Sequence, residues 1–269
     1  MSALAAASFA PFSAPGAVRP DSKFGGVQIG LNTGFSYRNM PNDAETVLKY
    51  LVRDNINAIE MQSPTHEYWA GAPKSPPRPY PEHIGGEQVG APPRPPLTLE
   101  QQAARKKYAE DMTRWRTSVS VNKYMELRTM YNDAGVSFYA FKLQLDMRMS
   151  DAEFDYAFTA AKMLGCNQLT MEMPDNNAAL TARIGKCAEK HKLPVGYHAH
   201  LQATPTSWNE AMSQSPYNCI NLDIGHYVAA CNHDTLEFIK RNHARITSLH
   251  IKDRKLPESG GQMSRGGHD

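Results

Sequence analysis

The chain has 269 residues and a mass of 29.9 kDa, a size that suits one barrel-sized domain or two smaller ones. Hydrophobic residues make up 41% and charged residues 21%, which excludes a wholly disordered chain. The formal net charge of +2 gives no electrostatic reason to expect nucleic acid or an acidic membrane as a partner. The four Cys form no C-x-x-C pair, so we expect buried thiols rather than a disulfide framework.

The first residues are Ala-rich, and small residues around positions 14–17 are typical of the end of a signal peptide, but the basic start of such a peptide is missing. We expect residues 1–23 to be a disordered tail or the remnant of a signal peptide, and residues 24–269 to form one domain. A signal remnant implies an exported or periplasmic protein, whereas a simple tail implies a cytoplasmic one.

Short apolar runs alternate with helical patterns along the domain. The first strand is expected at 27–31, followed by a helix with one apolar face over 44–52 and a strand at 56–61. Ten prolines lie in the next segment, 64–98, which we expect to be a long loop because proline disrupts helices and central strands. This loop is either a surface excursion or a lid or contact in a homo-oligomer.

From Leu99 to about Asn132 the pattern predicts one long helix, after which the alternation becomes regular. Further strands are expected at 136–142, 168–173, 195–200, 220–224 and 246–251, with helices at 151–164, 178–191, 207–213 and 235–243. This order predicts an α/β fold of the TIM (β/α)8 type. Because an eighth strand would fall beyond residue 269, we expect a barrel truncated to about seven βα units, with the Pro-rich insertion after strand 2.

Polar residues recur at the ends of these strands. Lys142, Glu172, His198, Asp223 and His250 follow one another at intervals of 30, 26, 25 and 27 residues. One βα unit has about this length, so the spacing places all five side chains at the carboxyl-end mouth of the barrel, where barrel enzymes build their sites.

Alternation along the strands predicts a polar inner face. Three sets of residues each share one side of a strand: Gln168, Thr170 and Glu172; Asn221 and Asp223; Ser248, His250 and Lys252. A purely structural barrel would fill its interior with aliphatic side chains, so this pattern favours a functional site.

Glu172, Asp223 and His250 combine two carboxylates with an imidazole, a set suited to Mn²⁺, Co²⁺, Mg²⁺ or Zn²⁺. A divalent ion there would acidify the C–H bond next to a sugar carbonyl and stabilise an enediolate, and a carboxylate beside the metal can act as general base. The candidates for contacts with sugar hydroxyls are His198, His200, His226, Lys142, Lys252 and Glu60.

Taken singly, each of these residues also has a structural interpretation. A strand-end acid often caps the next helix, a His is often an internally satisfied polar group, and a Lys often extends to solvent. The regular spacing of these residues along the chain favours a functional site over these separate explanations.

Three segments carry a resemblance to a known family: YHAHLQATPTSWNEA (197–211), NLDIGHYVAACN (221–232) and SLHIKDR (248–254). They resemble the xylose isomerase-like TIM-barrel superfamily of sugar phosphate isomerases and epimerases, and the resemblance extends over nearly the whole chain from about Ser22. The segments SKFGGVQIG (22–30) and AIEMQSP (58–64) fit an exported-looking branch.

The resemblance implies a divalent metal held by Glu at the fourth strand, Asp at the sixth, His at the seventh and Glu at the eighth. The first three fall on Glu172, Asp223 and His250, and the eighth-strand Glu has no counterpart in this sequence. The resemblance also implies that Glu172 is one of two acid/base carboxylates, and that His226 and His198 contact substrate oxygens.

The expected function is that of a divalent-metal-dependent sugar or sugar phosphate isomerase or epimerase, working through an enediolate on a small-molecule sugar. Two alternatives stay open: a metal-dependent dehydratase or hydratase of keto-sugars or inososes, and a non-catalytic sugar-binding protein that lacks the eighth-strand Glu. Phosphodiester cleavage, as in the endonuclease IV branch, is disfavoured because it needs more metal ligands and a basic face.

Overall fold

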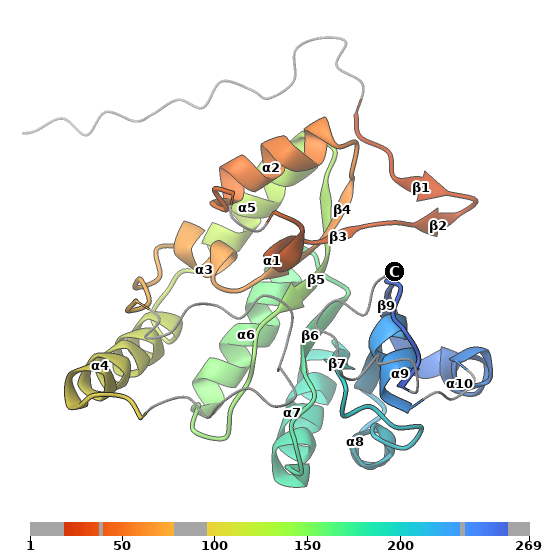
Figure 1. The fold of residues 1–269 in the computed structure, drawn as a ribbon. Coiled ribbons are helices and arrows are strands. Elements are labelled where there is room, and N and C mark those ends of the chain that lie inside the picture. Colours follow the sequence, from red (N-terminus) through yellow and green to blue (C-terminus); the bar gives the residue numbers. More distant parts are fainter. Residues whose placement is uncertain (1–18, 38–39, 78–95, 232–234, 258–269) are drawn as a thin grey trace, which may run out of the picture.

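The computed structural model describes residues 19–37, 40–77, 96–231 and 235–257. Its centre is a parallel sheet in which seven strands lie in the order of the chain (Figure 1). The strands are β3 (Leu31–Asn32), β4 (Ala58–Gln62), β5 (Ser137–Lys142), β6 (Gln168–Glu172), β7 (Val195–His198), β8 (Asn218–Asp223) and β9 (Ile246–His250). A parallel sheet in sequential order is the arrangement of a βα barrel, so the predicted α/β fold of about seven units is confirmed.

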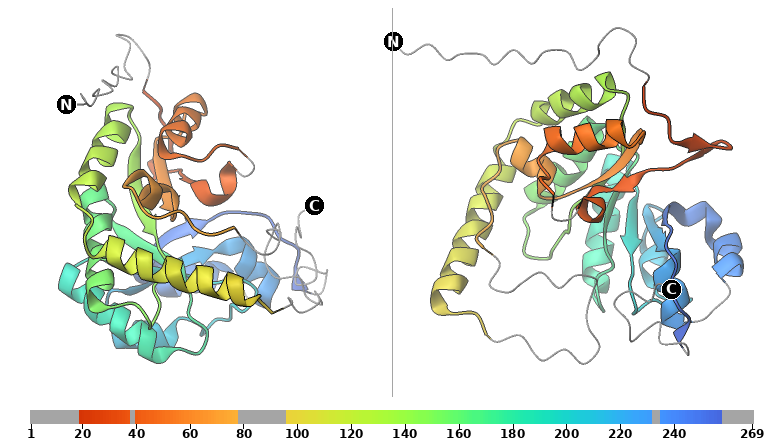
Figure 2. Two further views of the ribbon diagram at one scale, coloured as in Figure 1. Left: turned by 90° about the vertical axis from the view of Figure 1, so that its left-hand side faces the viewer. Right: turned by 45° about the horizontal axis from the view of Figure 1, so that its top comes forward.

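Helices follow the strands and cover the outer side of the sheet (Figure 2). The helix α5 packs against β5, α6 against β5 and β6, and α7 against β7 and β8. The helical segments are α1 (Thr33–Ser36), α2 (Ala44–Arg53), α3 (Thr65–Trp69), α4 (Leu99–Arg116), α5 (Asn122–Asp133), α6 (Asp151–Leu164), α7 (Ala178–His191), α8 (Asn209–Gln214), α9 (Ile224–Cys231), α10 (Thr235–Asn242) and the 3₁₀ turn His243–Arg245.

Local sequence signals set the ends of these helices. Ser150 caps α6 through the amide of Glu153, and the Glu153 side chain returns a bond to the Ser150 amide, so both free N–H groups are satisfied. The helix ends at Gly165, whose φ of 82° is a left-handed conformation that costs glycine little. The apolar side of α6, including Phe154 and Phe158, is buried in the core between helices and sheet.

The sheet curls, so that inner side chains from distant strands meet. Glu60 on β4 lies 2.7 Å from His250 on β9, and Gln168 on β6 donates to the carbonyl of Thr247 at 3.2 Å. The predicted polar inner face is therefore a connected interior. Asn221 is also fully buried, which agrees with the predicted alternation along its strand.

The first strand differs from the prediction over 27–31. Two strands, β1 (Lys23–Phe24) and β2 (Val27–Gln28), form an antiparallel hairpin that projects from the body (Figure 1). Gly25 and Gly26 turn it with φ values of 55° and 85°, the left-handed pair that a two-residue hairpin turn requires. Only Leu31–Asn32 joins the parallel sheet.

The long helix predicted from Leu99 to Asn132 is two helices, α4 and α5, separated at residues 117–121. The hydroxyls of Thr117 and Ser118 donate back to carbonyls of the last turn of α4, the nearest being Thr113 O and Arg114 O at 2.8 Å each. Arg114 O thus accepts the Ser118 hydroxyl in place of the Ser118 N–H, which bonds to Trp115 O instead at 3.0 Å, and the α-helical pattern ends there.

Two further expectations are corrected near loops. The segment 64–98 was expected to hold no helix, yet α3 forms over Thr65–Trp69; its residues 78–95 lie outside the described part. Ordered structure also begins before residue 24, since Ser22 is 1% exposed and donates its hydroxyl to Asn57 at 2.7 Å. Most of the predicted tail, residues 1–18 of 1–23, lies outside the described residues.

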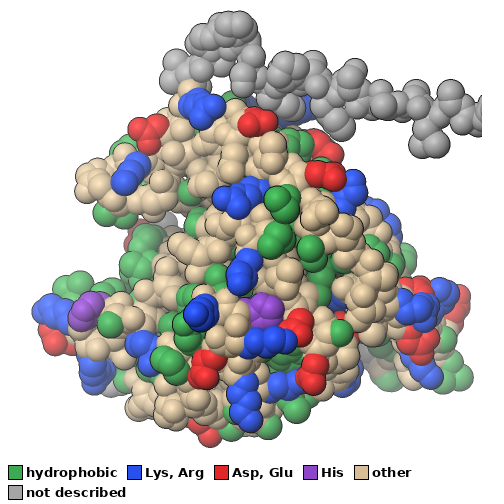
Figure 3. Space-filling view, turned by 180° about the vertical axis from the view of Figure 1, so that it is seen from behind, with side chains coloured by type: hydrophobic (Ala, Val, Ile, Leu, Met, Phe, Trp, Pro, Cys, Tyr) green, Lys and Arg blue, Asp and Glu red, His purple; other side chains and the backbone are tan. Residues whose placement is uncertain are grey.

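Two expectations from composition can be compared with the described chain. All four Cys are free thiols; Cys166 and Cys219 are buried as predicted, whereas Cys187 and Cys231 are only partly buried. None of the described helices is both long and apolar enough to cross a membrane. On the face drawn in Figure 3, basic and acidic side chains are intermixed.

Candidate metal centre

Asp223 ends β8 and stands directly before α9. Its Oδ1 accepts the backbone N–H of His226 at 2.9 Å and so caps the helix. The structural interpretation of a strand-end acid is therefore correct for one oxygen of Asp223. The other oxygen, Oδ2, turns to the inside of the barrel mouth, towards Lys252 and three imidazole rings.

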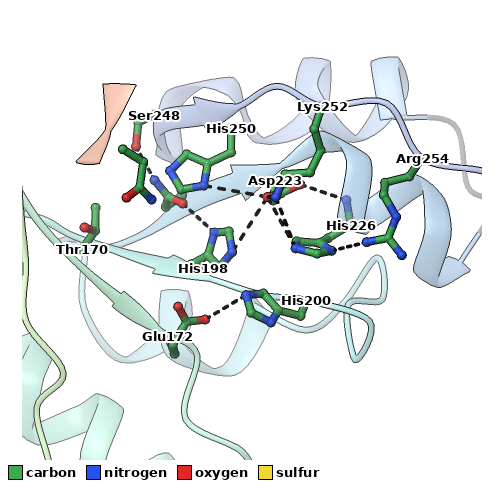
Figure 4. A network of polar contacts seen from close by, with 12 residues as sticks. Thr170, Glu172, His198, His200, Asp223, His226, Ser248, His250, Lys252 and Arg254 are labelled. Carbon is green, nitrogen blue, oxygen red and sulfur yellow. Dashed lines mark hydrogen bonds and ion pairs between the residues drawn. The ribbon is translucent and has the colours of Figure 1, made fainter. Parts of the chain in front are cut away.

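Four nitrogen atoms surround Asp223 Oδ2 (Figure 4). Lys252 Nζ lies 2.6 Å away, His226 Nε2 3.7 Å, His250 Nδ1 3.8 Å and His198 Nε2 3.9 Å. The carboxylate is 1% exposed, and Oδ2 forms an ion pair with Lys252 but has no partner with hydrogen-bond geometry among the described residues. A buried carboxylate oxygen in this situation is suited to a cation.

His198 is held so that one ring nitrogen stays available. Its Nδ1 lies 2.9 Å from the Asn221 amide oxygen, which can only accept, so Nδ1 carries the proton and Nε2 keeps its lone pair. The Asn221 amide nitrogen in turn donates to Ser248 Oγ at 2.6 Å, which fixes the orientation of the amide. His198 therefore presents Nε2 towards Asp223 as a metal ligand would.

His250 is oriented by a carboxylate behind it. Its Nε2 lies 2.7 Å from Glu60 Oε2, and Thr170 donates to the other oxygen of Glu60 at 2.6 Å. A histidine whose second nitrogen is bonded to a carboxylate is the usual arrangement of a metal-ligating imidazole. The prediction that Glu60 contacts substrate does not fit this position, because Glu60 is 0% exposed and both of its oxygens are engaged.

Burial and neighbouring charge decide the protonation of the cluster. Burial lowers the pKa of His226 to about 3 and also holds the pKa of His198 and His200 below the ordinary value, so these rings are neutral at pH 7. Burial acts the same way on His250, but its interactions with the carboxylates of Asp223 and Glu60 outweigh it and raise the pKa to about 9.

For Asp223, burial favours the neutral acid, yet the interaction with His250 and the charge of the Lys252 ammonium outweigh it. They hold the pKa of Asp223 well below its ordinary value, so it is a carboxylate. Protonated His250 and the Lys252 ammonium balance this charge in the metal-free chain. A bound divalent ion would replace the proton and the ammonium.

Glu172 ends β6 and lies beside this cluster. Its Oε1 pairs with Lys142 Nζ at 2.7 Å, and its Oε2 lies 3.5 Å from His200 Nε2. The structure thus brings Asp223 and His250 together with His198, and joins Glu172 to them through His200, whose ring centroid is 4.8 Å from that of His198. The role of Glu172 as a metal ligand stays a prediction.

A cavity of about 320 Å³ opens next to Glu172. Its walls include Lys142 and Glu172 from predicted strand ends, together with Gln62, Gln144 and Arg116. Sequence reasoning missed the last three. Gln62 ends β4 and Gln144 follows β5, so their positions at the strand ends were a usable signal, whereas Arg116 comes from α4 and reaches the cavity only through tertiary packing.

The residues present fit a divalent metal ion. His198, Asp223 and His250 each offer one donor atom, and the three atoms lie within 4.8 Å of one another. Two neutral-capable imidazoles and one carboxylate suit zinc, manganese or cobalt. The alternative trio His198, His200 and His226 offers the same proximity but lacks a negative charge.

No family profile and no curated protein sequence matches the chain. Its fold is similar to that of an uncharacterised protein from Parabacteroides distasonis, with a TM-score of 0.51 and 18% identity over 84% of this chain and 75% of that one. It is also similar to the probable 3-DHS dehydratase AsbF of Bacillus anthracis, involved in petrobactin synthesis, with a TM-score of 0.57 and 12% identity over 86% and 75%.

The chain therefore shares the βα-barrel fold of these two proteins. The resemblance carried by the sequence segments is thereby confirmed for the fold. In a barrel of this kind the carboxyl ends of the strands form the site, and the cluster around Asp223 lies at these ends.

The Glu60 carboxylate gives a direct test of this geometry. We expect Glu60→Gln to lower the affinity for Mn²⁺ by about 10- to 100-fold, because an amide at this position holds His250 less firmly and makes its Nδ1 a weaker ligand. Isothermal titration of the two proteins with Mn²⁺ measures the change. Glu45→Gln on α2, outside the barrel interior, is the control, and equal affinities in Glu60→Gln and wild type would contradict the arrangement.

Proposed function

We propose that the protein is a divalent-metal-dependent sugar or sugar phosphate isomerase or epimerase that removes a proton next to a carbonyl. The observation that carries this proposal is the cluster of His198, Asp223 and His250 with a reachable carboxylate, Glu172, beside it. His198, Asp223 and His250 would hold a divalent ion, which would supply positive charge next to a substrate carbonyl and to an enediolate. The proposal thus has two parts: the substrate is a sugar or a sugar phosphate, and the reaction depends on a divalent metal ion.

Glu172 is the best placed base of the site. Its side chain is 41% exposed and lines the cavity, so a substrate carbon can approach it. The 2.7 Å contact with Lys142 orients the carboxylate, while Asp223 and Glu60 are buried and engaged. Glu172 can therefore take the proton while the metal-ligating groups keep their positions.

The remaining polar side chains suit hydroxyl groups. The rings of His200 and His226 lie 4.5 Å apart between Glu172 and Asp223, and both are neutral for the reason given above. A neutral imidazole donates through one nitrogen and accepts through the other, as a sugar hydroxyl does. Arg254 Nη1 holds His226 at Nδ1 at 3.0 Å, and Lys252 Nζ lies 3.3 Å from its Nε2. A metal that neutralises Asp223 would let Lys252 turn to a substrate oxygen and would leave His226 Nε2 available to a hydroxyl.

A dehydratase of keto-sugars is the second candidate, because the Lys142 ammonium lies 2.7 Å from Glu172. This pair places an acid next to a base, and elimination of water needs both: a base for the C–H proton and an acid for the leaving hydroxyl. The same residues would then carry out loss of water after proton removal.

Hydrogen exchange distinguishes these functions. The protein with Mn²⁺ is incubated in D₂O with a panel of aldoses, ketoses and their phosphates, and NMR follows deuterium at the carbon next to the carbonyl. We expect exchange with at least one sugar and a decrease of about 10²- to 10⁴-fold in Glu172→Gln. Glu126→Gln, on the exposed side of α5, is the matched control.

Loss of water without an interconverted isomer would favour the dehydratase. Sugar binding that is unchanged by chelation, with no exchange, would favour a non-catalytic sugar-binding protein. Exchange that persists unchanged in Glu172→Gln would overturn the assignment of Glu172 as base.

A further inference from the structure

A second group of metal-ligating side chains lies outside the barrel mouth, where α6 and α7 pack together (Figure 1). Cys187 and His191 are four residues apart on α7 and so share one side of that helix. Asp155 faces them from α6, with its Oδ1 2.8 Å from His191 Nε2 and 3.8 Å from Cys187 Sγ. The three donor atoms lie within 4.8 Å of one another.

This spacing is close to that of a tetrahedral zinc site. Zinc bonds of about 2.0 to 2.3 Å place neighbouring ligand atoms about 3.3 to 3.8 Å apart, so small side-chain rotations suffice. The His191 ring is held by stacking on Phe158, with centroids 5.3 Å apart and planes 20° apart. The Asp155 side chain is 40% exposed, which leaves one side open for a water ligand.

The charges around Asp155 also favour a cation. Lys190 Nζ lies 2.7 Å from each carboxylate oxygen and so occupies the place of a positive ion in the metal-free chain. This ammonium belongs to a side chain that is 63% exposed and can turn to solvent. The other nearby cations, Arg183 and Lys186, line an adjoining cavity of about 270 Å³, and Arg183 is paired with Asp151.

We propose that Asp155, Cys187 and His191 bind a zinc ion that joins α6 to α7, with water as the fourth ligand. A thiolate, an imidazole and a carboxylate are all zinc ligands, and thiolate disfavours magnesium and manganese. Burial and the charge of Asp155 raise the pKa of Cys187 to about 12, so binding replaces the thiol proton with zinc and releases that proton. This site is separate from the proposed function and does not depend on it.

Cobalt reports this site selectively, because a cobalt–thiolate bond gives a charge-transfer band in the near ultraviolet. The full chain, freed of metal by chelation, is titrated with Co²⁺ and then with Zn²⁺. We expect a thiolate band that saturates at one equivalent and that Zn²⁺ abolishes. Cys187→Ser should lose the band, and His191→Ala should need about tenfold or more Co²⁺ to reach it.

Two controls distinguish metal binding at this site from metal binding at the barrel mouth. Cys231→Ser, at a half-buried thiol on α9, should keep the band, and Asp223→Asn should keep it too because the mouth cluster contains no thiol. Absence of a thiolate band in the wild-type chain, or a band that persists in Cys187→Ser, would overturn the zinc site without affecting the proposed function.

Discussion

Asp223→Asn is expected to lower the affinity for Mn²⁺ by about three orders of magnitude, which is about 4 kcal/mol. Asp223 is the carboxylate of the cluster, and asparagine has the same shape without the negative charge that compensates a divalent ion. The amide oxygen can still accept the N–H of His226, so the cap of α9 and the fold should be retained. The Mn²⁺ affinity from titration calorimetry and the rate of hydrogen exchange should decrease together.

The matched control is Asp175→Asn, because Asp175 is exposed in the loop after β6 at the same end of the barrel. Asp175→Asn should leave the Mn²⁺ affinity within twofold of the wild-type value. If Asp223→Asn bound Mn²⁺ as tightly as wild type, the metal would lie elsewhere in the protein.

Glu67→Gln is expected to destabilise the fold by about 3 to 5 kcal/mol, the effect of breaking a buried ion pair from one side. Glu67 on α3 is 1% exposed and accepts from Arg116 Nε at 2.9 Å, from Ser63 at 2.6 Å and from Tyr156 at 3.1 Å. The substitution leaves the Arg116 guanidinium, only 14% exposed, without its main counter-charge. Urea denaturation measures the difference.

Glu126→Gln is the control for this prediction, because the Lys123–Glu126 pair is about half exposed on both sides. Pairs of that kind contribute about 0 to 1 kcal/mol. An equal loss of unfolding free energy in Glu67→Gln and Glu126→Gln would contradict the claim that the buried pair stabilises the fold.

Because Glu67 titrates, we also expect the stability of the fold to depend on pH. Burial raises the pKa of Glu67, but the Arg116 charge outweighs it and holds the pKa below the ordinary value of 4.5. A carboxyl with a depressed folded-state pKa stabilises the fold above pH 4.5, and that stability is lost as the pH falls through the folded value. Wild type should therefore lose more stability than Glu67→Gln between pH 5 and pH 3.

The barrel and much of its mouth were predictable from the sequence, for a physical reason. A βα unit has a nearly constant length, so residues at 25- to 27-residue intervals, such as His198, Asp223 and His250, reach the same end of the sheet. Alternation along strands then indicated that Thr170 and Asn221 face the interior, and the structure places both there.

Contacts between elements could not be predicted in this way. Periodicity reports which face of an element is apolar, and it does not report which partner the polar atoms find. Glu60 has the spacing of a mouth residue, yet the curl of the sheet places it behind His250. The pairing of Glu67 with Arg116 and of Asp155 with Cys187 joins segments that only tertiary packing brings together.

Local backbone chemistry explains the remaining differences. Gly25 and Gly26 stand between two short apolar segments, a pattern that also predicts a hairpin, and the single-strand interpretation overlooked it. The hydroxyls of Thr117 and Ser118 end α4 inside a region whose composition favours helix throughout.

A crystal of the protein soaked in Mn²⁺ tests the metal centre most directly, because anomalous scattering locates the ion without reference to activity. The arrangement of the cluster predicts one strong peak about 2.0 to 2.2 Å from Asp223 Oδ2, His198 Nε2 and His250 Nδ1, with Lys252 moved away. A strong peak elsewhere with these three side chains unchanged, or no peak in wild type at saturating Mn²⁺, would contradict the assignment.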